Sequence, residues 1–158
     1  MNREVQQFVA KHKDKLTGRI LEVGGLDVNG NLRGVIPDAL VTDMRAGKNV
    51  DHVCNAEDLI KEFGEQSFDS VVSAEMLEHA EKWREALHNM WGVLKDGGWL
   101  VMTMASIEKS YHGYPHDYVR LLREDLLQIW PSAVVEDVWP RSIGWTVQKP
   151  SAFNPWEV

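Results

Sequence analysis

Two acids and a histidine at regular spacing are the first candidates for chemistry. Glu75, Glu78 and His79 directly follow an apolar run, and residues three and four apart share one face if the stretch is helical. Carboxylates and imidazole can take a proton from a hydroxyl or an amine, or bind a hard cation. Because three side chains leave the ligand set of such a cation incomplete, we favour catalytic roles for Glu75 and His79 over a metal site.

A polar loop later in the chain is the second candidate. Residues 110–120 (SYHGYPHDYVR) are dense in groups that titrate and form hydrogen bonds, and loops held on a rigid sheet often carry binding residues. We expect His116 to be the general base, with Asp117 or Tyr118 beside it. The alternative is a polar surface loop in which Arg120 pairs with a carboxylate.

An apolar strand ending in glycines, at residues 20–30 (ILEVGGLDVNG), is the third candidate. Open α/β sheets bind ligands just beyond the carboxyl ends of such strands. The spacing G-x-G-x-x-G of dinucleotide sites is not present here, and Glu22 and Asp27 would repel a pyrophosphate. The same acids favour the sulfonium and ammonium groups of S-adenosylmethionine. A tight turn without any ligand is the alternative for this stretch.

Asp43 supports an adenosyl ligand of either kind. It ends the next apolar run, about 20 residues after Glu22, where an acid can accept hydrogen bonds from ribose hydroxyls. An exposed acid at a strand end, without a ligand, is the alternative interpretation.

Apolar patterning predicts strands alternating with helices. An N-terminal helix is expected within residues 1–17, and only about two helical turns fit between the glycine turn and Pro37. Strands are expected at residues 19–23, 39–43, 50–54, 68–73, 99–104, 133–139 and 143–148, and helices at 56–63, 83–94 and 122–130. The alternation predicts an α/β fold with a parallel sheet covered on both faces, made mixed by a final antiparallel pair.

Several short motifs occur in a fixed order along the chain: LEVG (21–24), Asp43, CNAEDL (54–59), FDSVVS (68–73) and LKDGGWL (94–100). Together they resemble the class I S-adenosylmethionine-dependent methyltransferases, in particular the small type 11 group. The resemblance implies a Rossmann-like fold with a seven-stranded mixed sheet of order 3-2-1-4-5-7-6 and helices on both faces. It also implies the donor-binding residues: Glu22, Gly24, Gly25 and Ser73 near the methionyl part, Asp43 at the ribose, and Met44, Asn55 and Ala56 at the adenine.

Two further segments resemble parts of known families. Residues 75–79 resemble the Glu-x-x-Glu-His site of small-RNA 2′-O-methyltransferases and of ubiquinone-pathway O-methyltransferases, in which magnesium activates a hydroxyl. Glu75, Glu78 and His79 would be the ligands, completed by His112 or His116. Residues 116–120 resemble the His-Asp-Tyr-x-Arg segment of many type 11 enzymes. The chain departs from that group in lacking a third well-placed glycine in the first turn, in the short helix after it, and in Asn55, where Asp is usual.

Composition limits the classes of partner. A length of 158 residues predicts a single methyltransferase domain over 1–158, and a formal net charge of −7 argues against general nucleic-acid binding. No apolar run is long enough to cross a bilayer, so we expect no membrane partner. The single cysteine, Cys54, and the polar N-terminus fit a cytoplasmic protein. Within the domain we expect an N-terminal helix in 1–17, a donor-binding core in 19–104, an acceptor-side loop, helix and strand pair in 105–149, and a tail in 150–158.

The sequence therefore predicts an enzyme that transfers a methyl group from S-adenosylmethionine to an O or N atom of a small-molecule acceptor, such as a sugar or a phenol. A second subunit in a homodimer could supply the substrate cap that a chain of this length lacks. The alternative from another class is a non-catalytic domain that binds an adenosyl ligand and regulates or scaffolds a partner. An NAD-dependent enzyme ranks third because of the acids in the first turn.

Overall fold

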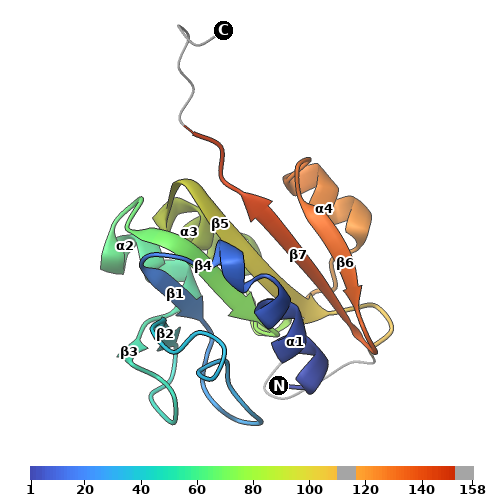
Figure 1. Ribbon diagram of the computed structural model, residues 1–158, viewed down its shortest axis with the longest axis horizontal. Coiled ribbons are helices and arrows are strands. Elements are labelled where there is room, and N and C mark those ends of the chain that lie inside the picture. Colours follow the sequence, from blue (N-terminus) through green and yellow to red (C-terminus); the bar gives the residue numbers. More distant parts are fainter. Residues whose placement is uncertain (110–116, 152–158) are drawn as a thin grey trace, which may run out of the picture.

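The computed structural model describes residues 1–109 and 117–151, which form one mixed sheet with helices on both faces (Figure 1). The strand order β3-β2-β1-β4-β5-β7-β6 confirms the predicted topology. The strands are β1 (Ile20–Val23), β2 (Leu40–Asp43), β3 (His52–Val53), β4 (Phe68–Ala74), β5 (Leu94–Ala105), β6 (Val134–Val138) and β7 (Ser142–Gln148). Neighbours from β3 to β5 are parallel, whereas β7 is antiparallel to both β5 and β6.

Two apolar layers cover the two faces of the sheet. One contains α2 (Leu59–Phe63), α3 (Trp83–Val93) and α4 (Arg123–Ile129), which bury residues such as Leu59, Met90 and Leu126. The other contains α1 (Arg3–Lys11) and the connection between β1 and β2. Short 3-10 turns complete the helical structure: η1 (Lys13–Lys15), η2 (Ala56–Asp58) and η3 (Leu77–His79). In the described ranges, no helix is long and apolar enough to cross a membrane.

Local hydrogen bonds explain where the outer helices begin. The Val5 N–H donates to Asn2 Oδ1 at 2.8 Å at the start of α1, and the Leu122 N–H donates to Asp125 Oδ2 at 2.8 Å at the start of α4. Such side-chain caps satisfy backbone groups that the helix itself leaves unpaired. His12 Nε2 lies 2.7 Å from Glu136 Oε2, which links the end of α1 to β6.

The connection between β1 and β2 differs from the short helix that the sequence allows. It consists of bends and turns, and Leu32 and Ile36 fill the space against the sheet with almost no exposed surface. The Arg33 guanidinium donates to Ala39 O at 3.0 Å, Asn49 Oδ1 at 3.0 Å and Asp51 Oδ2 at 3.1 Å. Side-chain bonds to distant residues thus stabilise the segment in place of a helical ladder.

The strand β5 begins earlier than predicted. It starts at Leu94, opposite Phe68, but Ser70 of β4 pairs with Trp99, so the residues in between form an irregular bulge. Gly97 within it has φ +83°, a left-handed value that favours glycine. Residues 95–98, between the predicted helix at 83–94 and the predicted strand at 99–104, are therefore part of the strand.

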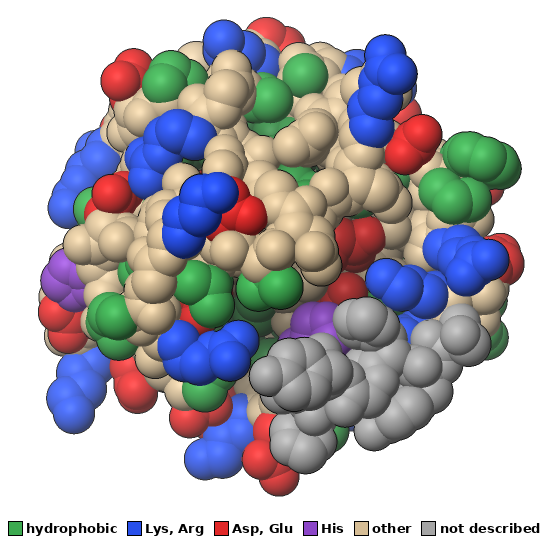
Figure 2. Space-filling model, turned by 90° about the horizontal axis from the view of Figure 1, so that it is seen from below, with side chains coloured by type: hydrophobic (Ala, Val, Ile, Leu, Met, Phe, Trp, Pro, Cys, Tyr) green, Lys and Arg blue, Asp and Glu red, His purple; other side chains and the backbone are tan. Residues whose placement is uncertain are grey.

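One edge of the sheet collects most of the candidate residues, and we call it the carboxyl edge. The parallel strands β1, β2, β4 and β5 all end there. The turn between β6 and β7 lies at the same edge, because Ser142 at the start of β7 pairs with Ala105 at the end of β5. Figure 2 views the molecule from below Figure 1 and shows acidic side chains and a histidine within a depression.

Candidate functional site at the carboxyl edge

Glu22 is the buried acid of the first turn. Its side chain is almost fully buried, and burial raises the pKa of the carboxyl group to about 7, while the charge of Arg33 acts in the opposite direction. Its Oε2 atom has no hydrogen-bond partner among the described residues. A buried carboxylate without a full set of partners is stabilised by a cation. The sulfonium and ammonium groups of S-adenosylmethionine would supply positive charge, so Glu22 fits this donor.

The two glycines after β1 make a turn too tight for a side chain. Gly24 has φ +77°, and a Cβ atom there would lie 2.2 Å from Met76 Cγ; a Cβ at Gly25 would lie 2.3 Å from Val41 Cγ1. Both N–H groups donate to Thr42 O at 2.9 Å. The turn therefore requires glycine because Gly24 packs against Met76 and Gly25 against β2, and the contact of the turn with a donor stays a prediction.

Asp43 ends β2 beside this turn. Its Oδ2 accepts from the Leu26 N–H and its Oδ1 from the Arg45 N–H, both at 3.1 Å. Each carboxylate oxygen has a second lone pair, so ribose hydroxyls could still donate to Asp43. Met44 follows with 64% of its surface exposed and can pack on a planar base.

Asn55 and Ala56 follow β3 at the same edge. The Asn55 Oδ1 accepts from the Glu57 N–H at 3.2 Å at the start of η2, of which Ala56 is the first residue. The ends of β1, β2 and β3 thus bring together seven of the eight predicted donor-binding residues: Glu22, Gly24, Gly25, Asp43, Met44, Asn55 and Ala56.

Ser73 is the eighth, and its position is different. It is fully buried within β4, and its hydroxyl donates to Val23 O at 2.9 Å. The hydroxyl therefore links β4 to β1 rather than facing an open surface. A role for Ser73 at the methionyl end of the donor stays a prediction, which rests on its position near the end of β4.

Sequence reasoning missed Asn49 and the internal partners of Asp27, which support the first turn. Asn49, with φ 75°, donates through Nδ2 to Gly25 O at 2.8 Å and accepts from Arg33. Asp27 accepts from Asn31 and from the Gly30 N–H, lies 3.4 Å from Lys48 Nζ, and these contacts lower the pKa of its carboxyl group. The charge of Asp27 is thus engaged inside the loop, which leaves Glu22 as the buried acid for a cationic donor.

Glu75 and Glu78 lie at the end of β4, on the other side of the edge. The shared helical face considered for Glu75, Glu78 and His79 does not form, because Glu75 has φ 55° and only Leu77–His79 make a 3-10 turn. The Glu75 N–H donates to Thr103 O at 3.0 Å. A left-handed backbone at a residue other than glycine is costly, and such strain often occurs at functional sites.

The two carboxyl groups share a buried environment. Burial first, and then the charge of Glu78, raise the pKa of Glu75 to about 7, against a hydrogen bond that the Ser142 hydroxyl donates to Glu75 Oε1. Burial also raises the pKa of Glu78, whose Oε1 accepts from the Ala105 N–H at 3.3 Å. In the part of the chain that is described, the Oε2 atom of each has no partner. A carboxylate with a pKa near neutrality can act as a general base.

A metal site at these residues finds no support. Among residues 1–109 and 117–151, no three His, Cys, Asp or Glu side chains are arranged to hold a cation. His112 and His116, named as further ligands or as the base, lie outside the described residues. We therefore derive no step from magnesium, and the catalytic role of His116 stays a prediction, as does that of half-buried His79.

The end of the polar loop packs against Glu78. The Tyr118 N–H donates to Glu78 O at 2.7 Å, and the Arg120 guanidinium pairs with both oxygens of the buried Asp117 carboxylate. The ion pair considered for Arg120 is thus present. The hydrogen bond from Tyr118 to Glu78 holds this segment next to the acidic pair at the carboxyl edge.

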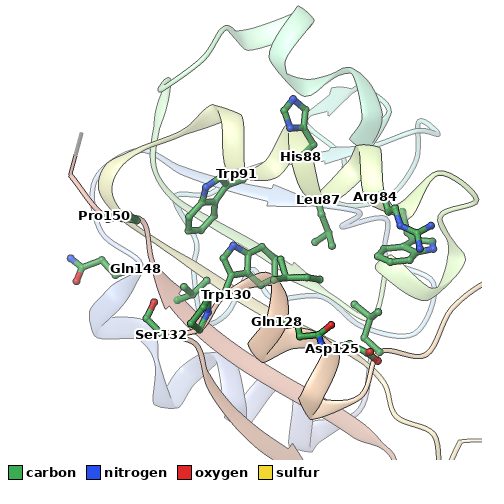
Figure 3. A pocket seen from close by; sticks show the side chains of 15 residues that line it. Arg84, Leu87, His88, Trp91, Asp125, Gln128, Trp130, Ser132, Gln148 and Pro150 are labelled. Carbon is green, nitrogen blue, oxygen red and sulfur yellow. The ribbon is translucent and has the colours of Figure 1, made fainter. Parts of the chain in front are cut away.

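A groove of about 810 Å³ lies elsewhere, between α3, α4 and the end of β7 (Figure 3). Three tryptophans, Trp83, Trp91 and Trp130, contribute much of its wall, and the ring centroids of Trp91 and Trp130 are 5.6 Å apart. None of the predicted donor-binding residues lines it. The candidate site is therefore the carboxyl edge and not this groove.

Comparisons with known proteins agree with this site. A family model described as a methyltransferase domain matches residues 15–102, more than half of the chain. A S-adenosylmethionine-dependent methyltransferase from Archaeoglobus fulgidus has the same fold, with a TM-score of 0.70, 14% identity and coverage of 92% of this chain and 93% of that one. No curated protein sequence matches the chain.

Two further solved structures share the fold. The 1,6-didemethyltoxoflavin-N1-methyltransferase of Burkholderia thailandensis, solved with its substrate and S-adenosylhomocysteine, has a TM-score of 0.67 and 12% identity over 94% of this chain and 78% of its own. The putative methyltransferase solved with the activator Trm112 of Haloferax volcanii has a TM-score of 0.63 and 15% identity over 92% and 90%. With the family match and the buried acids at the carboxyl edge, these findings show that the chain belongs to the methyltransferase domain family and is an S-adenosylmethionine-dependent methyltransferase.

Proposed function

We propose that the enzyme transfers the methyl group to an O or N atom of a small-molecule acceptor. The observation that carries this proposal is the buried pair Glu75 and Glu78 beyond β4, where each Oε2 lacks a partner among the described residues. A hydroxyl or a protonated amine must lose a proton before or as it attacks the methyl carbon. A carboxyl group with a pKa of about 7 can accept that proton near neutral pH.

The donor supplies the reactive methyl group, and the residues of this chain hold the donor and the acceptor in position. Glu22 would face the cationic methionyl part, Asp43 would accept from the ribose hydroxyls, and the tight turn at Gly24 and Gly25 would allow close approach. Holding two reactants in line converts a bimolecular step into an effectively unimolecular one and so lowers the barrier to such a displacement. Glu75 would take the proton, with His79 and His116 as further candidates for proton transfer.

The acceptor class draws support from one neighbour. The Burkholderia thailandensis enzyme is by its description an N1-methyltransferase of a small heterocycle. We extend to this chain only the class, a small molecule with a nitrogen or oxygen nucleophile. A screen of small-molecule libraries with labelled S-adenosylmethionine tests it, and label transferred only to carbon, or only to protein or nucleic acid, contradicts it. The proposal also includes a homodimer in which the second subunit supplies the substrate cap. One structural neighbour, the Haloferax volcanii methyltransferase, was solved in complex with an activator protein.

Donor binding provides the first prediction. S-adenosylmethionine or S-adenosylhomocysteine should raise the melting temperature, because a ligand that binds only the native state stabilises it. Asp43→Ala should weaken donor affinity about 10-fold or more, since a hydrogen bond to a charged group contributes about 1.5–3 kcal/mol. Calorimetric titration measures this effect. Asp38→Ala, an exposed acid in the connection before β2, is the control and should bind like the wild type. Equal affinities for all three proteins would exclude Asp43 from the donor site.

A further inference from the structure

Three buried carboxyl groups at the carboxyl edge each have one oxygen without a partner. Among residues 1–109 and 117–151, unpartnered buried carboxylate oxygens occur only in Glu22, Glu75 and Glu78, at the Oε2 atom of each. Glu22 of β1 is opposite Val72 of β4, and Glu75 follows the end of β4 directly. The three acids therefore lie at the ends of two adjacent strands.

The methyl donor balances the charge of one of these acids. S-adenosylmethionine carries a sulfonium, an ammonium and a carboxylate, so it has a single net positive charge, which Glu22 would neutralise. Glu75 and Glu78, the acidic pair, then receive no counter-charge from the donor. Burial raises the pKa of both carboxyl groups of the pair, because a charge inside the protein is costly unless a cation accompanies it.

The positive groups of the protein near the acidic pair do not bond to its free oxygens. Arg120 acts on the pair from a distance but is bound to both oxygens of Asp117, and the N-terminal ammonium donates to Asn29 O at 2.6 Å. The charge of Lys109 acts on both acids, yet neither Oε2 accepts a hydrogen bond from it or from any other described residue. Residues 110–116 add two histidines but no lysine or arginine.

The protein holds the other oxygen of each acid. The Ser142 hydroxyl donates to Glu75 Oε1, and the Ala105 N–H donates to Glu78 Oε1 at 3.3 Å. Glu78 is only 1% exposed, and a buried oxygen without a donor costs free energy. Each carboxyl group is thus oriented through Oε1, which leaves Oε2 for a ligand that brings hydrogen-bond donors.

An ammonium group can satisfy both free oxygens, whereas a hydroxyl group cannot. A primary ammonium has three N–H donors and a positive charge, so it can donate to both Oε2 atoms and neutralise part of their charge. A hydroxyl has one donor and no charge, so one Oε2 would stay without a partner. The charge and the donor count at the acidic pair therefore both favour an amine over an alcohol or a phenol.

The surroundings of the pair also favour a cation. In the segments that follow β1 to β5, together with the turn between β6 and β7, acids outnumber lysines and arginines. Figure 2 shows acidic side chains within the depression at this edge. A cleft with an excess of one charge attracts ligands of the opposite charge.

We propose that the acceptor is an aliphatic primary amine that binds in its ammonium form, with one N–H donated to Glu75 and another to Glu78. This inference rests on the proposed function, because it identifies the acceptor class of the same site. Glu78 holds the ammonium, and Glu75 takes one proton from it; the positive sulfonium nearby favours loss of that proton. The nitrogen lone pair then forms the new bond to the methyl carbon while the bond from that carbon to sulfur breaks and its electrons go to sulfur. The products are a methylammonium and S-adenosylhomocysteine, and the proton remains on Glu75.

Matched pairs of amines and alcohols test the proposal. Phenethylamine, putrescine and glucosamine are compared with phenethyl alcohol, butanediol and glucose, which carry hydroxyl groups in place of the amines. Calorimetric titration into the complex with S-adenosylhomocysteine measures affinity independently of turnover. At least one amine should bind about 10-fold or more tightly than its hydroxyl counterpart, and should receive label from S-adenosylmethionine at nitrogen.

Variants of the pair and of its neighbours separate recognition from folding. Glu78→Gln keeps the shape of the side chain and should weaken amine affinity about 10-fold or more and raise KM, while affinity for S-adenosylhomocysteine stays within about twofold. Lys109→Gln removes a competing positive charge, so it should strengthen amine binding about twofold or more. Glu81→Gln, an exposed acid three residues after Glu78, is the matched control and should bind the amine like the wild type.

Failure of the inference is distinguishable from failure of the proposed function. Methyl transfer to no small molecule at all, amines included, contradicts the proposed function and the inference with it. Transfer to hydroxyls or neutral aromatic nitrogens, with amines bound no more tightly than their hydroxyl counterparts, overturns the inference alone. So does an amine affinity that Glu78→Gln leaves unchanged or that Glu81→Gln lowers equally. If the melting temperature shows that Glu78→Gln does not fold, the wild-type comparison and Lys109→Gln decide.

Discussion

Glu75→Gln should lower turnover by about 100-fold or more, the usual contribution of a general base, while donor affinity stays within about twofold of the wild type. The amide has the same shape as the carboxyl group and can still accept the hydrogen bond from the Ser142 hydroxyl. It cannot take a proton from the acceptor. Single-turnover rates and calorimetric donor titration, measured on the same protein, separate the two effects.

The pH profile distinguishes a base from a structural residue. The pKa of Glu75 is raised to about 7, so wild-type turnover should increase with pH as this carboxyl group loses its proton. The variant should lose that dependence. Glu108→Gln, an exposed acid in the loop after β5, is the matched control and should keep both the rate and the profile. A variant with unchanged turnover, or one whose donor affinity falls as much as its rate, contradicts the assignment.

The order of elements could be predicted because each carries a strong local pattern. Runs such as residues 68–73 are apolar enough to be buried strands, and the residues of α3 repeat at helical spacing. The strand order came from the resemblance of the motifs, and the structure confirms it. The position of the donor side could be predicted in part: Asp43 ends a predicted strand, Glu22 lies one residue before the end of another, and parallel strands bring their ends together. Asn55 came from the resemblance, and the contacts of all three residues with a donor stay predictions.

The parts that could not be predicted depend on contacts between distant residues. Nothing in the spacing of Arg33, Asn49 and Asp51 shows that one guanidinium would bond to residues both before and after β2. The left-handed backbone of Glu75 is also invisible in a pattern that allows a helix. Ser142 reaches Glu75 only because β7 runs antiparallel to β5. A sequence reports local preference, whereas these features follow from tertiary packing.

Glu22→Gln should make the free energy of unfolding less dependent on pH. Burial raises the pKa of Glu22 from 4.5 to about 7 in the folded protein, so the folded state holds a proton that the unfolded state releases. The stability from this group is complete below about pH 4.5 and is lost as pH rises through about 7. At one pKa unit per about 1.4 kcal/mol, the loss amounts to roughly 3 kcal/mol, and the pKa of about 7 already includes the opposing charge of Arg33.

Urea denaturation at a series of pH values measures this effect. Above pH 7 the variant should be more stable than the wild type by about 2–3 kcal/mol, and near pH 4.5 the two should agree. Glu75 and Glu78 titrate in the same direction in both proteins, so the difference between the two curves isolates Glu22. Glu65→Gln, an exposed acid, should follow the wild type at every pH.

The gain in stability should come with weaker donor binding, because the amide no longer offers a negative charge to the sulfonium and ammonium groups. A variant that is less stable than the wild type by the same amount at every pH would contradict this interpretation. It would show that the Glu22 carboxylate is ionised and paired in the folded protein over the whole pH range.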